Sequence, residues 1–252
     1  MKLIESLKGI FFNKNLGSSR RCVAFTLAEI LITLGIIGVV ASLTIPTLVK
    51  NYQKEQTVTQ LKKAFSTINQ VFQTSTAENG FPDTWDFGAD SDSVTTEKVV
   101  QTYIIPYLSI QKDCGYNFAG ECTRKTKYNM KPGSTFTFSN YQVMLRDGTV
   151  WSFSLDRLVA EDPPCIIQIQ VDLNGDKKPN VRGKDVFFIQ FQKGINKARF
   201  FGGGISSRTT LLNGGSGGTN WGCNKTNTNA GIMCGALIQY DGWQIKDDYL
   251  WD

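Results

Sequence analysis

A long run of apolar residues occupies the N-terminal part of the chain. Between Phe25 and Val49, Glu29 is the only charged residue. A helix over this run would be roughly 37 Å long, enough to cross a hydrocarbon core about 30 Å thick. Lysine and arginine residues precede the run, and such residues hold the N-terminal side of a membrane helix in the cytoplasm. The pattern predicts a membrane helix, with the rest of the chain exported.

After this run, apolar residues recur at the spacing of a helix. The recurring positions are Val58, Leu61, Phe65, Ile68 and Phe72. Spacings of three and four residues place these side chains in one stripe, which needs a folded domain to pack on. We therefore predict one long helix over residues 25–77, kinked or locally melted at Pro46 and ended by Gly80 and Pro82.

The remaining residues, about 78–252, show the alternation that is typical of β-strands. Two alternating runs flank Asp147–Gly148, which is a strong hairpin signal. A second pair of strands is predicted at 165–172 and 185–192, on either side of a polar loop. The expected fold is α+β, with a long N-terminal helix packed on a globular head built mainly of antiparallel sheet.

Three further segments of the head have weaker patterns. Residues 94–108 are expected to form a helix that stops near Pro106. Residues 201–235 are rich in Gly, Asn, Thr and Ser, which predicts a long surface loop. The last segment, from Ala236 to Trp251, alternates like a strand and ends in large aromatic residues.

Charge and composition exclude several functions. The net charge is +5, of which residues 1–24 carry +4, because they hold five basic residues and one acidic residue. The nearly neutral remainder offers no basic face for phosphates, so no nucleic-acid partner is expected. The chain has no histidine, which excludes Ser-His-Asp and Cys-His catalytic arrangements. No pattern assigns a catalytic role, and we do not expect an enzyme.

Three kinds of export segment are compatible with the apolar run. A Sec signal peptide would be cut after the run, where "VVAS" offers a poor site. A twin-arginine signal is suggested by Arg20 and Arg21, but Cys22 displaces the apolar residues expected there. A segment of the third kind is cut before the run, which leaves the helix on the mature protein.

The sequence "AFTLAEILITLGIIGVVASLTIP", which begins at Ala24, favours the third kind. It resembles the prepilin signature of type IV pilins and type II secretion pseudopilins. In that family a membrane peptidase cuts before a Phe and N-methylates it. A Glu stands at the fifth mature position, and a Pro often stands at the twenty-second. Phe25, Glu29 and Pro46 match these positions, whereas Ala24 replaces the usual Gly.

The resemblance implies a division of the chain and a role for its buried carboxylate. The implied segments are a leader at 1–24, a helix at 25–77 whose first half spans the membrane or forms a filament core, and the head at 78–252. A carboxylate in lipid is costly unless it has a partner. The implied partner of Glu29 is the free amine of Phe25 in a neighbouring subunit. The alternative is a lone Glu29 that is protonated or reaches the membrane interface.

A polar patch, "VDLNGDKKPNVRGKD", joins the second pair of predicted strands. Its candidate metal ligands are Asp172, Asn174, Asp176, Asn180 and Asp185. Calcium takes six to eight oxygen ligands, but the patch lacks the glycine and glutamate positions of an EF-hand, and basic residues dilute its negative charge. It resembles a loop of many prepilin-type heads, and some pseudopilin heads bind calcium through a comparable loop. Two interpretations stay open: a calcium site, and a structural loop whose side chains cap their own turns. No cofactor is required.

The cysteines after the apolar run suggest two local disulfides, as is usual in exported proteins. Cys114 and Cys122 are close in sequence, as are Cys223 and Cys234. Cys165 is then the unpaired one, although sequence alone does not fix the pairing.

The leading hypothesis is a structural subunit of a type IV pilus or a type II secretion pseudopilus. The resemblance places it in the bacterial inner membrane with an exported head, and its filament in the periplasm or on the cell surface. The implied partners are other pilins of the same or different kind, the prepilin peptidase and the assembly machinery. The alternative is a membrane-anchored binding or adhesive protein, in which Trp85, Trp221 or Trp243 would stack on sugars.

Overall fold

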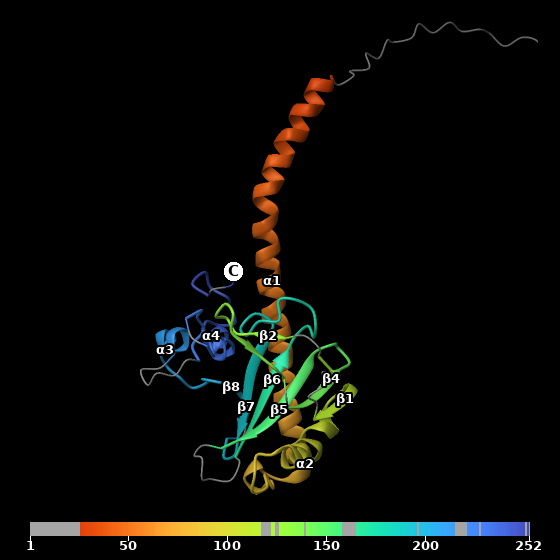
Figure 1. Cartoon of the computed structure of the whole chain (residues 1–252), viewed down its shortest axis with the longest axis vertical. Coiled ribbons are helices and arrows are strands. Elements are labelled where there is room, and N and C mark those ends of the chain that lie inside the picture. Colours follow the sequence, from red (N-terminus) through yellow and green to blue (C-terminus); the bar gives the residue numbers. More distant parts are fainter. Residues whose placement is uncertain are drawn as a thin grey trace, which may run out of the picture. The chain divides into compact units, whose positions relative to one another are not determined.

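A computed structural model gives the fold of the chain (Figure 1). The residues that it describes are 26–116, 122–123, 126–138, 140–157, 165–195, 197–214, 221–226, 228–249 and 251. The chain divides into two compact units, residues 1–49 and residues 50–252. This boundary lies inside the first helix, so the second half of that helix is in the same compact unit as the head.

Helix α1 spans Leu27–Asn79, close to the predicted range. It remains helical through Pro46, so the local melting expected there is absent. A proline removes a single N–H donor, and the turns on either side keep their own hydrogen bonds. The helix ends at Asn79, and the next residue, Gly80, has a φ of +79°, which favours a residue without a side chain.

Six strands form one antiparallel sheet in the order β1-β4-β5-β6-β7-β8. Their bounds are β1 Ile110–Tyr116, β4 Tyr141–Leu145, β5 Val150–Asp156, β6 Ile166–Asp172, β7 Val186–Gln192 and β8 Arg199–Phe200. Both predicted strand pairs are confirmed. β4 and β5 turn at Asp147–Gly148, and β6 pairs with β7 along its whole length.

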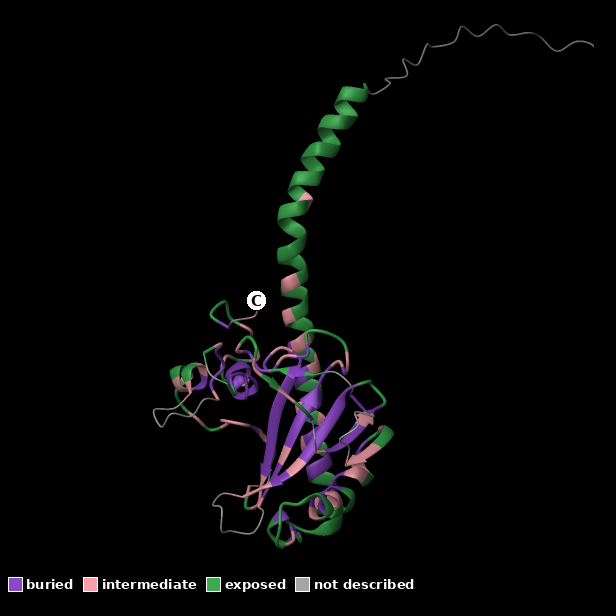
Figure 2. Ribbon diagram, viewed as in Figure 1, coloured by how far each residue is buried: buried purple, intermediate pink, exposed green. Residues whose placement is uncertain are grey.

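The apolar stripe of α1 packs against one face of this sheet, as its spacing predicted. Leu61 and Ile68 are fully buried. Phe72 stacks on Phe191 of β7, with 4.0 Å between ring centroids. In Figure 2 the strands are largely buried, and the second half of α1 passes behind them. The core of the head therefore lies between α1 and the sheet.

A smaller apolar cluster lies on the opposite face of the sheet. It comprises Cys122, Phe138, Val150 and Val186. Phe138 follows a two-stranded sheet made of β2 (Lys127–Tyr128) and β3 (Thr135–Phe136). The cluster places this small sheet beside the loop that joins β6 to β7, where the candidate metal ligands lie.

Three further helices belong to the head. They are α2 (Ser93–Tyr103), α3 (Arg208–Asn213) and α4 (Cys234–Tyr240), with short 3-10 helices at Pro82–Thr84 and Ile105–Tyr107. The side chain of Asp92 accepts a hydrogen bond from the N–H of Thr95 and so caps α2. The helix predicted at 94–108 is thus confirmed, and its end near Pro106 is a 3-10 turn.

Two predictions for the C-terminal part are wrong. Where a strand was expected from Ala236, the chain forms α4 instead. The segment 201–235, expected to be a surface loop, contains α3 and several buried residues. The spacing of apolar residues in a short segment fits a helix and a strand equally well, so tertiary contacts decide which of the two forms. Gly235 lies so close to Phe200 that an added Cβ would be 2.4 Å from the ring. This helix–sheet contact is not visible in the local pattern.

Replacing Phe72 with alanine tests the packing of α1 on the sheet. Phe72→Ala should lower the free energy of unfolding of the head by about 3–5 kcal/mol, because it leaves a cavity against Phe191. Urea unfolding of the detergent-solubilised chain, followed by tryptophan fluorescence, measures this loss. All five tryptophans lie within residues 50–252, so the signal reports the head. Exposed Gln73→Ala is the control, and equal stability of the two variants would contradict the packing.

Candidate functional site

The first candidate site is the start of α1. The Oγ1 of Thr26 accepts a hydrogen bond from the N–H of Glu29 at 3.2 Å. In return, the Glu29 carboxylate accepts from the N–H and the hydroxyl of Thr26, both at 2.8 Å. This reciprocal pair is a capping box. The other two predicted processing residues, Ala24 and Phe25, lie outside the described residues.

The first half of α1 exposes a continuous apolar surface. Its large apolar side chains between Leu27 and Val49 are 45–75% exposed. Covering one such side chain stabilises by about 1.5–3 kcal/mol, so this surface calls for a lipid or protein environment. Within the described part of the chain, α1 is the one helix long and apolar enough to cross a membrane. The prediction of a membrane anchor is supported by length and composition.

The second candidate site is the loop between β6 and β7, here called the Asx loop (residues 172–185). Asp172, the last residue of β6, begins it. One carboxylate oxygen of Asp172 accepts from the backbone N–H groups of Asn174 (3.1 Å) and Gly175 (2.9 Å). This is the turn-capping geometry that an aspartate favours.

A second aspartate closes the same loop. The carboxylate of Asp185 accepts from the backbone N–H groups of Asn180 at 2.6 Å and Val181 at 2.7 Å. Asn180 has a φ of +57°, a conformation that asparagine tolerates better than most residues. Both oxygens of Asp185 are therefore occupied by backbone donors.

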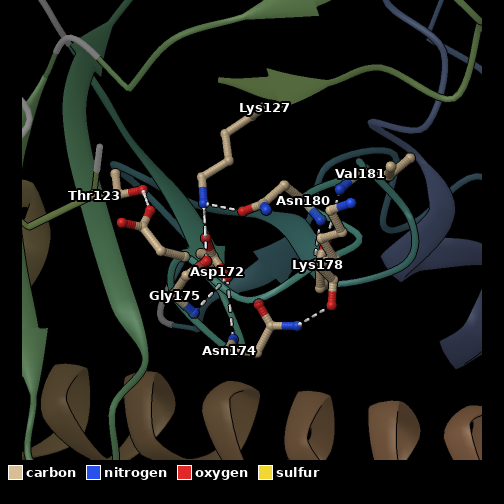
Figure 3. Close-up of polar contacts among 10 residues, drawn as sticks. Thr123, Lys127, Asp172, Asn174, Gly175, Lys178, Asn180 and Val181 are labelled. Carbon is tan, nitrogen blue, oxygen red and sulfur yellow. Dashed lines mark hydrogen bonds and ion pairs between the residues drawn. The ribbon is translucent and has the colours of Figure 1, made fainter. Parts of the chain in front are cut away.

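A lysine from another part of the chain lies at the centre of the Asx loop. The Nζ of Lys127, on β2, donates to the carboxylate of Asp172, to Asn180 Oδ1 at 2.6 Å and to the carbonyl oxygen of Gly175 at 3.0 Å. Figure 3 shows the ammonium group directed at these groups. Lys127 and Asp172 are both fully buried. The sequence around Lys127 gives no sign that its side chain is buried, so Lys127 was not among the residues predicted for this site.

Backbone pairing holds Lys127 in this position. The N–H of Tyr128 donates to the carbonyl oxygen of Asn180 at 2.8 Å. The N–H of Arg182 donates to the carbonyl oxygen of Tyr128, also at 2.8 Å. Nearby, the hydroxyl of Thr123 donates to Asp176 at 2.6 Å. Two segments that are about 45 residues apart in sequence are thus joined as one unit.

Burial dominates the electrostatics of the two aspartates. It raises the pKa of Asp172 to about 6, although Lys127 acts in the opposite direction. It also raises the pKa of Asp185, against the two backbone N–H groups that stabilise its charge. Both carboxylates therefore depend on their donors to remain ionised in the interior.

The five predicted ligands do not converge on one point. Asp172 and Asn180 meet at Lys127, Asp176 bonds Thr123, and Asp185 bonds backbone. Asn174 donates to the carbonyl oxygen of Lys178 at 3.4 Å. Among the residues that the structure describes, no group of three or more His, Cys, Asp or Glu side chains is placed to hold a metal ion.

Both expected disulfides are present. Cys114 is bonded to Cys122, and Cys223 to Cys234, while Cys165 is free. The first disulfide belongs to the small cluster beside the Asx loop. The second is buried and fixes the start of α4. Each is expected to stabilise the head by about 2–4 kcal/mol.

The three tryptophans considered as sugar platforms all pack on the core of the head. Trp85 is 2% exposed and stacks on Tyr103 with 4.5 Å between centroids. Trp221 and Trp243 are partly buried against the same core.

Comparison with known proteins assigns the head to a family but not to a function. A family model described as "Family of unknown function (DUF6613)" matches residues 47–251. No curated protein and no solved structure matches the chain. The matched region begins near the end of the apolar run and covers the Asx loop, both disulfides and the whole sheet.

Substitution of Asp185 tests whether its carboxylate holds the Asx loop. Asp185→Ala should lower the free energy of unfolding by about 2–4 kcal/mol, because it leaves two buried N–H groups without an acceptor. Asp185→Asn should lose about half as much, because one amide oxygen remains. The exposed Asp90→Ala is the matched control and should change stability little. If Asp185→Ala is as stable as this control, the carboxylate does not hold the loop.

Proposed function

The chain belongs to DUF6613, a family of unknown function, and we propose that it is a pilin-like structural subunit that assembles through its N-terminal helix. The filament would be a type IV pilus or a type II secretion pseudopilus. The role is mechanical and requires neither catalysis nor a cofactor. The protein would be stored in the inner membrane with its head exported.

One observation carries this proposal: the two halves of α1 have opposite surroundings. The residues from Val58 to Ser75 bury one stripe in the head. In the part of the chain that the structure describes, no residue from Leu27 to Val49 is buried, and the large apolar side chains of this run are exposed. A helix that is hydrophobic all round needs a surrounding apolar phase. Lipid supplies this phase before assembly, and the same helices of neighbouring subunits would supply it afterwards.

Processing before the apolar run follows from the same proposal. A peptidase would cut between Ala24 and Phe25 and N-methylate Phe25. The helix would remain on the mature subunit, unlike the apolar segment of a signal peptide that is cut after its run. Partners would be further pilin subunits, the peptidase and the assembly machinery, with the filament in the periplasm or on the cell surface.

Glu29 would have two successive partners. In the structure its carboxylate closes the capping box with Thr26. In a filament it would pair with the free amine of Phe25 in a neighbouring subunit. Two points support this pairing. Glu29 is the only charged residue in the apolar run, and a desolvated ion pair would fix the register of packed helices.

Glu29→Gln separates these two partners. Glutamine can still close a capping box but carries no charge. If the ion pair drives assembly, Glu29→Gln should insert in the membrane normally and reduce filament yield more than tenfold, as loss of at least about 1.4 kcal/mol per subunit implies. Sheared-filament yield and membrane-fraction content are the two measurements.

Glu55→Gln is the control, because it removes the next glutamate on the same helix at an exposed position. It should leave assembly unchanged. Normal filament yield from Glu29→Gln would contradict the charge pairing and leave Glu29 as a helix cap.

A further inference from the structure

We infer that the ammonium group of Lys127 is the resident cation of the Asx loop, and that the head binds no calcium ion there. The inference concerns the head alone and holds whether or not the chain assembles into filaments. The Asx loop has the oxygen atoms that suit a cation, and the side chain of Lys127 already supplies one. Lys127 is 0% exposed, so its charge is fully enclosed by the protein.

The donors and acceptors at the centre of the loop are matched in number. An ammonium group has three N–H donors. Three acceptors surround it: the carboxylate of Asp172, Asn180 Oδ1 and the carbonyl oxygen of Gly175. Each donor has one acceptor, so the group is fully satisfied without a water molecule or a metal ion.

Most of the oxygens that a calcium ion would need are already committed. Among the candidate ligands that the structure describes, the one buried oxygen without a hydrogen-bond partner, Asn174 Oδ1, is far short of a ligand set. Calcium requires six to eight oxygens around one point. The second oxygen of Asp172 accepts two backbone N–H groups, and each oxygen of Asp185 accepts one. A divalent ion at this centre would also lie beside a buried positive charge, which like-charge repulsion strongly disfavours. The residues present therefore do not fit a calcium ion while Lys127 is in place.

Unlike a free ion, Lys127 also links two parts of the chain. It is covalently part of β2, so its charge ties the small β2–β3 sheet to the Asx loop. Its Nζ lies 5.8 Å from the centroid of the Phe138 ring, which belongs to the apolar cluster on the same side of the sheet. The stability of this corner of the head then depends on the fold itself and not on the concentration of a metal outside the cell.

The test is thermal unfolding of the detergent-solubilised full chain, followed by tryptophan fluorescence, in millimolar calcium and in excess chelator. The wild-type Tm should be the same in both conditions. Lys127→Met should lower Tm by about 10 °C or more, because it leaves Asp172 charged, buried and unpaired. Lys177→Met, which removes an exposed lysine of the same loop, is the matched control and should leave Tm unchanged.

A double variant keeps the test decisive if Lys127→Met does not fold. Lys127→Met with Asp172→Asn removes both charges together and should recover part of the lost Tm, since replacing both partners of a buried pair is less costly than breaking it. A wild-type Tm that rises by more than about 3 °C with calcium would overturn the inference. So would a Lys127→Met variant as stable as Lys177→Met.

Discussion

The burial of one stripe of α1 against the sheet is the interaction on which the rest of the structure depends. The stripe supplies one side of the core of the head, where Phe72 stacks on Phe191 of the sheet. The same helix continues without a break from this packed stripe through Pro46 to Leu27. The proposed function follows from that continuity, because one helix carries both the packed stripe and the exposed apolar run.

The opposite face of the sheet combines a small apolar cluster with a buried ion pair. Asp172 ends β6 and is fully buried, which is tolerable only with a partner. Lys127 supplies that partner from β2, and backbone pairing of Tyr128 with the Asx loop holds the lysine in place. A segment that contributes little to the main core is thereby made part of the head. The Cys114–Cys122 disulfide secures the same corner.

The sequence predicted correctly those features that depend on residues close together in the chain. The hairpin at Asp147–Gly148, the long helix and both disulfides were read correctly, because turn residues, spacing and proximity in sequence determine them. α4 was mistaken for a strand, since its conformation depends on contact with Phe200. Lys127 was missed because a lysine is normally exposed, and only the three-dimensional pairing of β2 with a distant loop buries it. The Asx loop was identified, but the nature of its cation could not be read from acidic residues alone.

The central claim is that α1 stays on the mature protein as an assembly helix. The most direct measurement is the mass and N-terminal sequence of the protein purified from its native membrane fraction. The account predicts a chain that begins at Phe25 with one methyl group on its amine. An N-terminus at Met1, or one beyond Ser42, would contradict it, because neither corresponds to a processed pilin-like subunit.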